Sequence, residues 1–83
     1  MTTQAERRAA TRARLIAAAR EHFARDGYQA THTGRILEQA GVSRGALYHH
    51  FPSKQDLFEA VFVDVSKEAI EQAGRRGLSL IHI

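Results

Sequence analysis

The sequence predicts an all-α fold, and three observations lead to this prediction. Apolar residues recur at helical spacing in two long stretches, residues 15–23 and 57–69. Gly27, Gly41 and Pro52 divide the chain into pieces of helical length. No stretch has the alternating apolar and polar residues of a half-buried strand. A chain of 83 residues with these features is expected to form one small helical domain.

The first helix is expected from about Arg8 to Asp26, where the composition is rich in alanine. Four apolar residues in it are spaced as in one buried stripe: Leu15, Ile16, Ala19 and Phe23. Gly27 is expected to end the helix, because glycine tolerates the left-handed conformation found there. Tyr28 is then expected to fold back onto the core.

The second helix is short, with its body at residues 34–40. Thr31 or Thr33 is expected to cap its first turn with a side-chain oxygen. Gly41 breaks the helix, and Ser43 is expected to cap the next one after a very short turn. This spacing is typical of two helices joined by a tight turn.

The third helix is expected from about Arg44 to His50, because Pro52 disfavours the helical conformation at Phe51. The fourth helix is expected to begin at Ser53, since residues 53–56 have the form of a capping box with aspartate in place of glutamate. Its apolar face comprises Leu57, Phe58, Val61, Phe62, Val65 and Ala69. The sequence therefore predicts a three-helix, homeodomain-like helix-turn-helix bundle followed by the start of a longer fourth helix.

The third helix is predicted to turn a polar face outward. At about 100° per residue, Leu47, Phe51 and Ser43 fall on one side, which we assign to the core. Arg44 and His50 lie on the flanks, and the opposite side carries Gly45, Tyr48 and His49. A bare backbone patch bordered by polar side chains suits the major groove of DNA, which the second helix of a helix-turn-helix enters.

Each of these residues also has a simpler interpretation. Gly45 can be a weak point in a marginal helix, and Tyr48 can be a half-buried core aromatic. His49 and His50 suggest a metal site, but neighbouring helical residues diverge by about 100° and no third ligand is suitably spaced. We therefore expect no metal and no other cofactor. Lys54 falls in a first helical turn that favours an anion, so it is expected to contact phosphate, the alternative being a solvated lysine.

The net charge of +3 is unevenly distributed. Residues 1–54 carry nine basic and four acidic side chains, whereas residues 55–83 carry three and five. The basic part contains the short third helix, which suits a polyanionic partner. Four arginines near the N-terminus are candidates for phosphate contacts: Arg7, Arg8, Arg12 and Arg14.

Several classes of protein are disfavoured by the composition. Without cysteine the chain has neither disulfides nor thiolate metal sites, which fits a cytoplasmic protein. No apolar run reaches the roughly 20 residues that span a membrane, so we expect no membrane partner. No nucleophile–base set or converging carboxylate pair is found, and we expect no enzymatic activity.

The motifs occur together as they do in the N-terminal DNA-binding domain of the TetR/AcrR family of transcriptional regulators, which the chain resembles from about Arg8 to Ala73. The matching residues are Gly27-Tyr28-x-Ala30-Thr31, Ile36, Ala40-Gly41-Val42-Ser43, Leu47-Tyr48-x-His50-Phe51 and Lys54-x-x-Leu57. The resemblance implies a cytoplasmic, homodimeric repressor of a palindromic operator in double-stranded DNA. In such a protein, a C-terminal domain binds a small-molecule inducer.

The resemblance also implies which residues meet DNA. The recognition-helix positions are Ser43, Arg44, Gly45, Ala46, Tyr48 and His49. His50 and Lys54 match positions that touch phosphate, and Thr31 and Thr33 match the start of the second helix, where it meets the DNA backbone. Alternatives are a stand-alone helix-turn-helix protein without effector control and a helical protein-interaction module.

Four residues depart from the family pattern. Thr33 stands where an apolar residue is usual, and Gly34-Arg35 stands where the family has arginine followed by an acidic residue. Leu37 stands where alanine is usual, at the approach of the second and third helices. These departures leave the fold prediction unchanged but affect the capping of the second helix and the details of base contact.

The predicted domain organisation follows from these elements. Residues 8–68 form the TetR-type helix-turn-helix domain, with the motif itself at about 31–50, and residues 69–77 end the fourth helix. Residues 78–83 read Leu-Ser-Leu-Ile-His-Ile, which resembles the in-frame translation of a transposase mosaic-end sequencing adapter. We predict that this tail is non-native and that the chain lacks the C-terminal ligand-binding domain; the alternative is a genuine start of a fifth helix.

Overall fold

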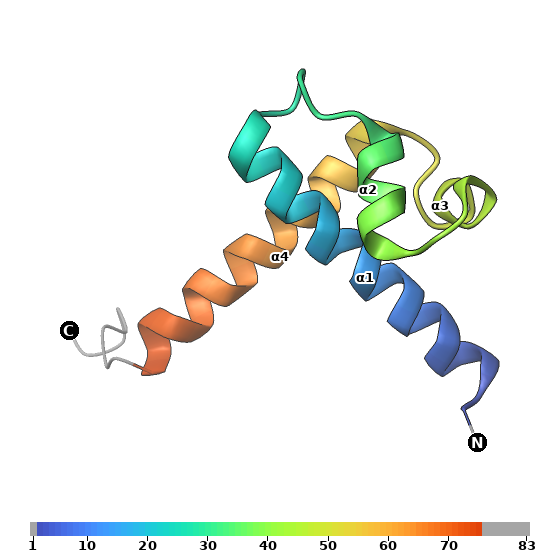
Figure 1. Ribbon diagram of the computed structural model, residues 1–83. Coiled ribbons are helices and arrows are strands. Elements are labelled where there is room, and N and C mark those ends of the chain that lie inside the picture. Colours follow the sequence, from blue (N-terminus) through green and yellow to red (C-terminus); the bar gives the residue numbers. More distant parts are fainter. Residues whose placement is uncertain (1, 76–83) are drawn as a thin grey trace.

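The computed structural model describes residues 2–75, which form four helices and no strand (Figure 1). The helices are α1 (Gln4–Asp26), α2 (Thr33–Ala40), α3 (Arg44–His50) and α4 (Lys54–Arg75). The predicted all-α class is therefore confirmed for this part of the chain. The prediction about residues 78–83 lies outside the described residues.

All four helices contribute to one hydrophobic core. The four largest fully buried side chains come one from each helix: Leu15, Ile36, Leu47 and Leu57. In Figure 1 the first turns of α1 and the last turns of α4 extend away from this core in different directions. The short helices α2 and α3 therefore depend on the central parts of α1 and α4 for their position.

Helix α1 begins before the predicted start at Arg8. Thr3 caps it, since its Oγ1 accepts a hydrogen bond from the backbone N–H of Glu6 at 3.1 Å. Residues 3–6 have the spacing of a capping box, a local signal that the expected boundary overlooked. The helix ends at Gly27, whose φ of 84° confirms the need for glycine there.

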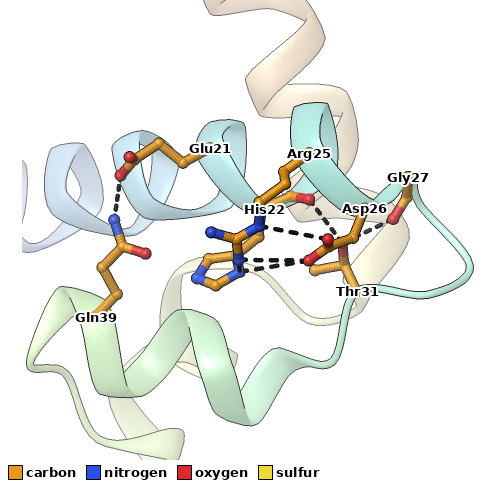
Figure 2. A network of polar contacts seen from close by, with 7 residues as sticks. All are labelled: Glu21, His22, Arg25, Asp26, Gly27, Thr31 and Gln39. Carbon is orange, nitrogen blue, oxygen red and sulfur yellow. Dashed lines mark hydrogen bonds and ion pairs between the residues drawn. The ribbon is translucent and has the colours of Figure 1, made fainter.

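Neither predicted threonine caps α2. The N-cap residue is His32, which makes no side-chain capping bond, and Thr33 is the first helical residue. Thr31 is only 2% exposed, and its hydroxyl lies 3.1 Å from the carbonyl oxygen of His22 and 2.7 Å from that of Gly27 (Figure 2). The hydroxyl of Thr31 thus stabilises the end of α1, which is why it is not available to α2.

A buried histidine lies at the same junction (Figure 2). The Nδ1 atom of His22 is 2.9 Å from the guanidinium of Arg25, which also contacts the Asp26 carboxylate. Because a guanidinium only donates, Nδ1 of His22 is the acceptor in this hydrogen bond. Within residues 2–75, Nε2 has no hydrogen-bond partner.

A separate hydrogen bond, from the Gln39 amide to the Glu21 carboxylate, joins α2 to α1 (Figure 2).

The remaining helix ends follow the sequence closely. Gly41 ends α2 with a φ of 67°, and the Ser43 hydroxyl caps α3 by accepting the N–H of Ala46 at 3.2 Å. Ser43 is exposed rather than part of the core side. At α4, the Ser53 hydroxyl accepts the N–H of Asp56 at 3.1 Å and donates to its carboxylate at 2.8 Å. The predicted cap at Ser53 is confirmed, with the hydroxyl itself as the donor to the carboxylate.

Only the first part of the predicted apolar face of α4 is buried. Leu57 and Val61 lie in the core, whereas Phe62 is 66% exposed and Val65 is 39% exposed. Beyond Val61, α4 is joined to α1 by a charged contact, in which Arg20 donates to Glu68 at 2.6 Å. This hydrogen bond is the main reason why the pKa of Arg20 is raised. Across residues 2–75, no helix has both the length and the apolar character needed to cross a bilayer.

Candidate nucleic-acid interface

Helix α3 divides into a buried and an exposed side as its sequence predicts. Leu47 and Phe51 are 2% and 4% exposed and hold the helix on the core. Tyr48 is 46% exposed, and Gly45 and His49 are also exposed. Tyr48 is therefore not a core aromatic, and the outward face carries polar groups around a bare stretch of backbone.

The backbone at Gly45 is open to a partner. A Cβ atom built at this position would meet nothing within 4 Å. The glycine is therefore not required by packing inside the domain. The α3 backbone is therefore accessible at this position.

An alanine at Gly45 is expected to have opposite effects on stability and on DNA binding. Alanine should stabilise α3 by roughly 0.5–1 kcal/mol, because glycine is the poorer helix former. The added methyl group should weaken DNA binding if the backbone lies against a groove. Thermal unfolding and fluorescence anisotropy with duplex DNA measure the two effects. A Gly45→Ala variant that is more stable and binds DNA as tightly as the wild type would contradict the proposed approach.

Arg44 links the start of α3 to the start of α2. Its guanidinium donates to the Thr33 Oγ1 atom at 3.4 Å and lies 3.8 Å from where a Cβ atom of Gly34 would stand. The Arg44 guanidinium thus lies beside residues 33 and 34, two of the positions that depart from the family pattern. Because Arg44 is exposed and this hydrogen bond is long, the guanidinium can leave Thr33 at little cost.

Lys54 lies at the first residue of α4 and is half-buried. Its Nζ atom is 4.4 Å from the centroid of the Tyr28 ring, within the range of a cation–π contact. Tyr28 in turn packs on Phe23 and Phe58, with ring centroids at 5.7 and 5.1 Å. The sequence indicated a lysine at a helix start but not the aromatic group that holds it, since Tyr28 comes from the loop after α1.

His50 is half-buried on the flank of α3, with its ring centroid 5.6 Å from that of His49. Burial lowers the pKa of His50, and electrostatic repulsion from His49, Arg12 and Arg8 lowers it further. The guanidinium groups of Arg12 and Arg8 therefore act on His50, and such cations suit a phosphate. No group of three potential metal ligands is found among residues 2–75.

Nine of the ten predicted site residues lie at least partly exposed around α3 and the helix starts next to it. They are Thr33, Ser43, Arg44, Gly45, Ala46, Tyr48, His49, His50 and Lys54. Thr31 is the exception, because it is buried with its hydroxyl directed to α1. We therefore leave Thr31 out of the interface proposed below.

Two short helices joined by a tight turn, the second with an exposed polar face, define a helix-turn-helix DNA-binding domain. The profile described as "Bacterial regulatory proteins, tetR family" matches residues 15–61. The chain therefore belongs to the tetR family of bacterial regulatory proteins, and it carries their N-terminal helix-turn-helix domain.

Individual relatives agree with this assignment. The HTH-type transcriptional regulator CymR of Pseudomonas putida is 40% identical over 74 residues, covering 89% of this chain and 36% of that protein. The HTH-type transcriptional regulator UidR of Escherichia coli (strain K12) is 37% identical over 60 residues, covering 72% and 31%. The HTH-type transcriptional repressor AcnR of Corynebacterium glutamicum is 35% identical over 68 residues, covering 82% and 36%. The chain thus spans about a third of the length of these relatives, two of which are named as transcriptional regulators and one as a transcriptional repressor.

Proposed function

We propose that this domain binds double-stranded DNA with α3 in the major groove and thereby regulates transcription. The observation that carries the proposal is the outward face of α3, where Gly45 leaves the backbone open beside Tyr48 and His49. Arg44 and His49 are the proposed base-reading side chains. Tyr48, His50 and Lys54 are proposed to contact phosphates, with Ser43, Ala46 and Thr33 at the edge of the interface.

The complete regulator is proposed to act as a cytoplasmic homodimeric repressor on a palindromic operator. A two-fold dimer places two recognition helices about one DNA turn, roughly 34 Å, apart, which matches two half-sites. A small-molecule inducer would act through a further, ligand-binding domain. We expect the 83-residue chain alone to bind an operator weakly, because a single helix-turn-helix contacts one half-site.

Alanine substitutions at Tyr48 and Lys54 test the DNA contact directly. Phosphate contacts carry no sequence information, so both variants should weaken binding on every duplex tested. Lys54→Ala should also reduce the slope of log affinity against log salt by about 1. Fluorescence anisotropy with several unrelated duplexes, over a series of salt concentrations, measures both effects.

Lys67 provides a matched control on the same helix. It is exposed and lies more than three turns along α4 from Lys54, so Lys67→Ala should leave affinity and salt slope nearly unchanged. Binding that does not weaken as salt rises would argue against DNA as the partner. Equal losses in Lys54→Ala and Lys67→Ala would instead show a general charge effect and reject the assigned role of Lys54.

A further inference from the structure

A groove of about 580 Å³ separates the first turns of α1 from α3. Its walls include Arg7, Arg8 and Thr11 on α1 and Ala46, His49 and His50 on α3. We call this the α1–α3 groove. His49 also belongs to the outward face of α3, so the groove adjoins the proposed DNA-reading surface.

The groove is polar on its α1 side because the apolar stripe of α1 is continued by polar residues toward the N-terminus. At about 100° per residue, Thr11 lies roughly 40° and Arg8 roughly 20° from Leu15 on the helix. Leu15 is fully buried, Thr11 is half-buried and Arg8 is exposed. The same face of α1 therefore carries the buried Leu15 in the core and, nearer the N-terminus, the Thr11 hydroxyl and the Arg8 guanidinium. These two polar groups lie where α1 passes α3.

The groove is also suited to an anion by its charge. None of its lining residues is acidic. His50 lines a second groove on its other side, whose charged residues are Asp56, Glu59, Asp64 and Lys67 of α4 and Arg12 of α1. The pKa of His50 is lowered first by burial and then by His49, Arg12 and Arg8, and no carboxylate is among the causes of the shift.

We infer that the α1–α3 groove binds a phosphate of the DNA backbone, with Arg8 and His50 as its principal ligands and Arg7 at its edge. The inference rests on the proposed function and extends the interface to the first two turns of α1, before the residues that the family profile matches. A guanidinium offers paired donors to a phosphate, and the small side chain of Ala46 leaves room for the anion.

Protonation of His50 is then coupled to DNA binding. In the free domain the lowered pKa of His50 favours the neutral ring, so folding stability is lost as pH falls below its ordinary value of 6.5. A phosphate in the groove acts in the opposite direction, because an adjacent anion raises the pKa and favours the charged ring. DNA binding therefore takes up a proton, and affinity rises as pH falls.

Arg8→Gln tests the groove, with Arg25→Gln as the matched control. Both arginines are exposed residues of α1 and both changes remove one charge, but Arg25 lies at the other end of the helix and does not line the groove. With the 83-residue chain and a mixed-sequence duplex of roughly 30 base pairs, Arg8→Gln should weaken binding about tenfold and reduce the salt slope by about 1. Arg25→Gln should match the wild type.

Two results would overturn the inference in distinguishable ways. If the wild type binds the duplex and the two glutamine variants behave alike, the α1–α3 groove holds no phosphate while the proposed function stands. If the wild type binds no duplex even at about 50 mM salt, where phosphate contacts are strong, the proposed function fails and the groove assignment fails with it.

The proton coupling has its own measurement. Lowering the pH from about 7.5 to about 6 should strengthen wild-type binding several-fold, since histidine titrates in this range. His50→Gln should show a clearly smaller gain, with only His49 and the other histidines left to respond. An equal gain in the two proteins would exclude His50 as the group that takes up the proton.

Discussion

Replacing Leu47 with alanine is expected to cause the largest loss of stability of any single change on α3. Leu47 is one of the four largest fully buried side chains and the only buried residue within α3 itself. Removing a buried leucine side chain costs about 2–5 kcal/mol, whereas small domains are stable by roughly 5–15 kcal/mol in total. A seven-residue helix has no stability of its own, so α3 is held by this packing and by Phe51.

Urea unfolding followed by circular dichroism measures the effect of Leu47→Ala. The neighbouring Tyr48→Ala variant is the control, because Tyr48 is exposed and its loss should change the free energy of unfolding by about 0.5 kcal/mol or less. The two variants should therefore lose different properties. Leu47→Ala should lower the free energy of unfolding, whereas Tyr48→Ala should lower only the affinity for DNA. Equal unfolding midpoints for the two variants would contradict the assignment of inward and outward faces on α3.

The helices of this domain could be predicted from the sequence because their signals are local. The break at Gly41, the cap at Ser43 and the stop at Pro52 each act within a few residues, and together they fixed α3 at its observed bounds. The same applies to the α4 cap at Ser53. The expected start of α1 was wrong, although Thr3 and Glu6 carry a local capping signal of the same kind.

Features that join distant residues could not be predicted in this way. Thr31 has the residue type and position of a helix cap, yet its hydroxyl turns to α1, since the buried carbonyl oxygen of His22 lies within reach. The cation–π contact between Lys54 and Tyr28 and the α1–α3 groove likewise depend on how the helices cross. Helical periodicity shows which face of a helix is apolar but not how far along the helix that face is covered, as α4 illustrates after Val61.

Arg44 is expected to have the largest effect on sequence preference. It is the first residue of α3, and the N-terminal residues of a recognition helix are those that meet base edges. A bidentate arginine–guanine contact contributes about 1–3 kcal/mol of discrimination, so Arg44→Ala should reduce the preference for one base by roughly 5- to 150-fold. In the free domain the guanidinium makes a weak hydrogen bond to Thr33. We expect this bond to break when the guanidinium moves into the major groove of DNA.

Selection from duplexes with randomised positions measures this preference for each variant. The sequences selected by Arg44→Ala should show a weaker base preference at one base pair. Those selected by His49→Ala should show a changed preference at a neighbouring base pair. Tyr48→Ala serves as the comparison, because a lost phosphate contact lowers all affinities while leaving the order of preferred sequences unchanged. If Arg44→Ala selects the same sequences as the wild type with uniformly lower affinity, Arg44 contacts phosphate. Base reading by α3 would then have to depend on His49.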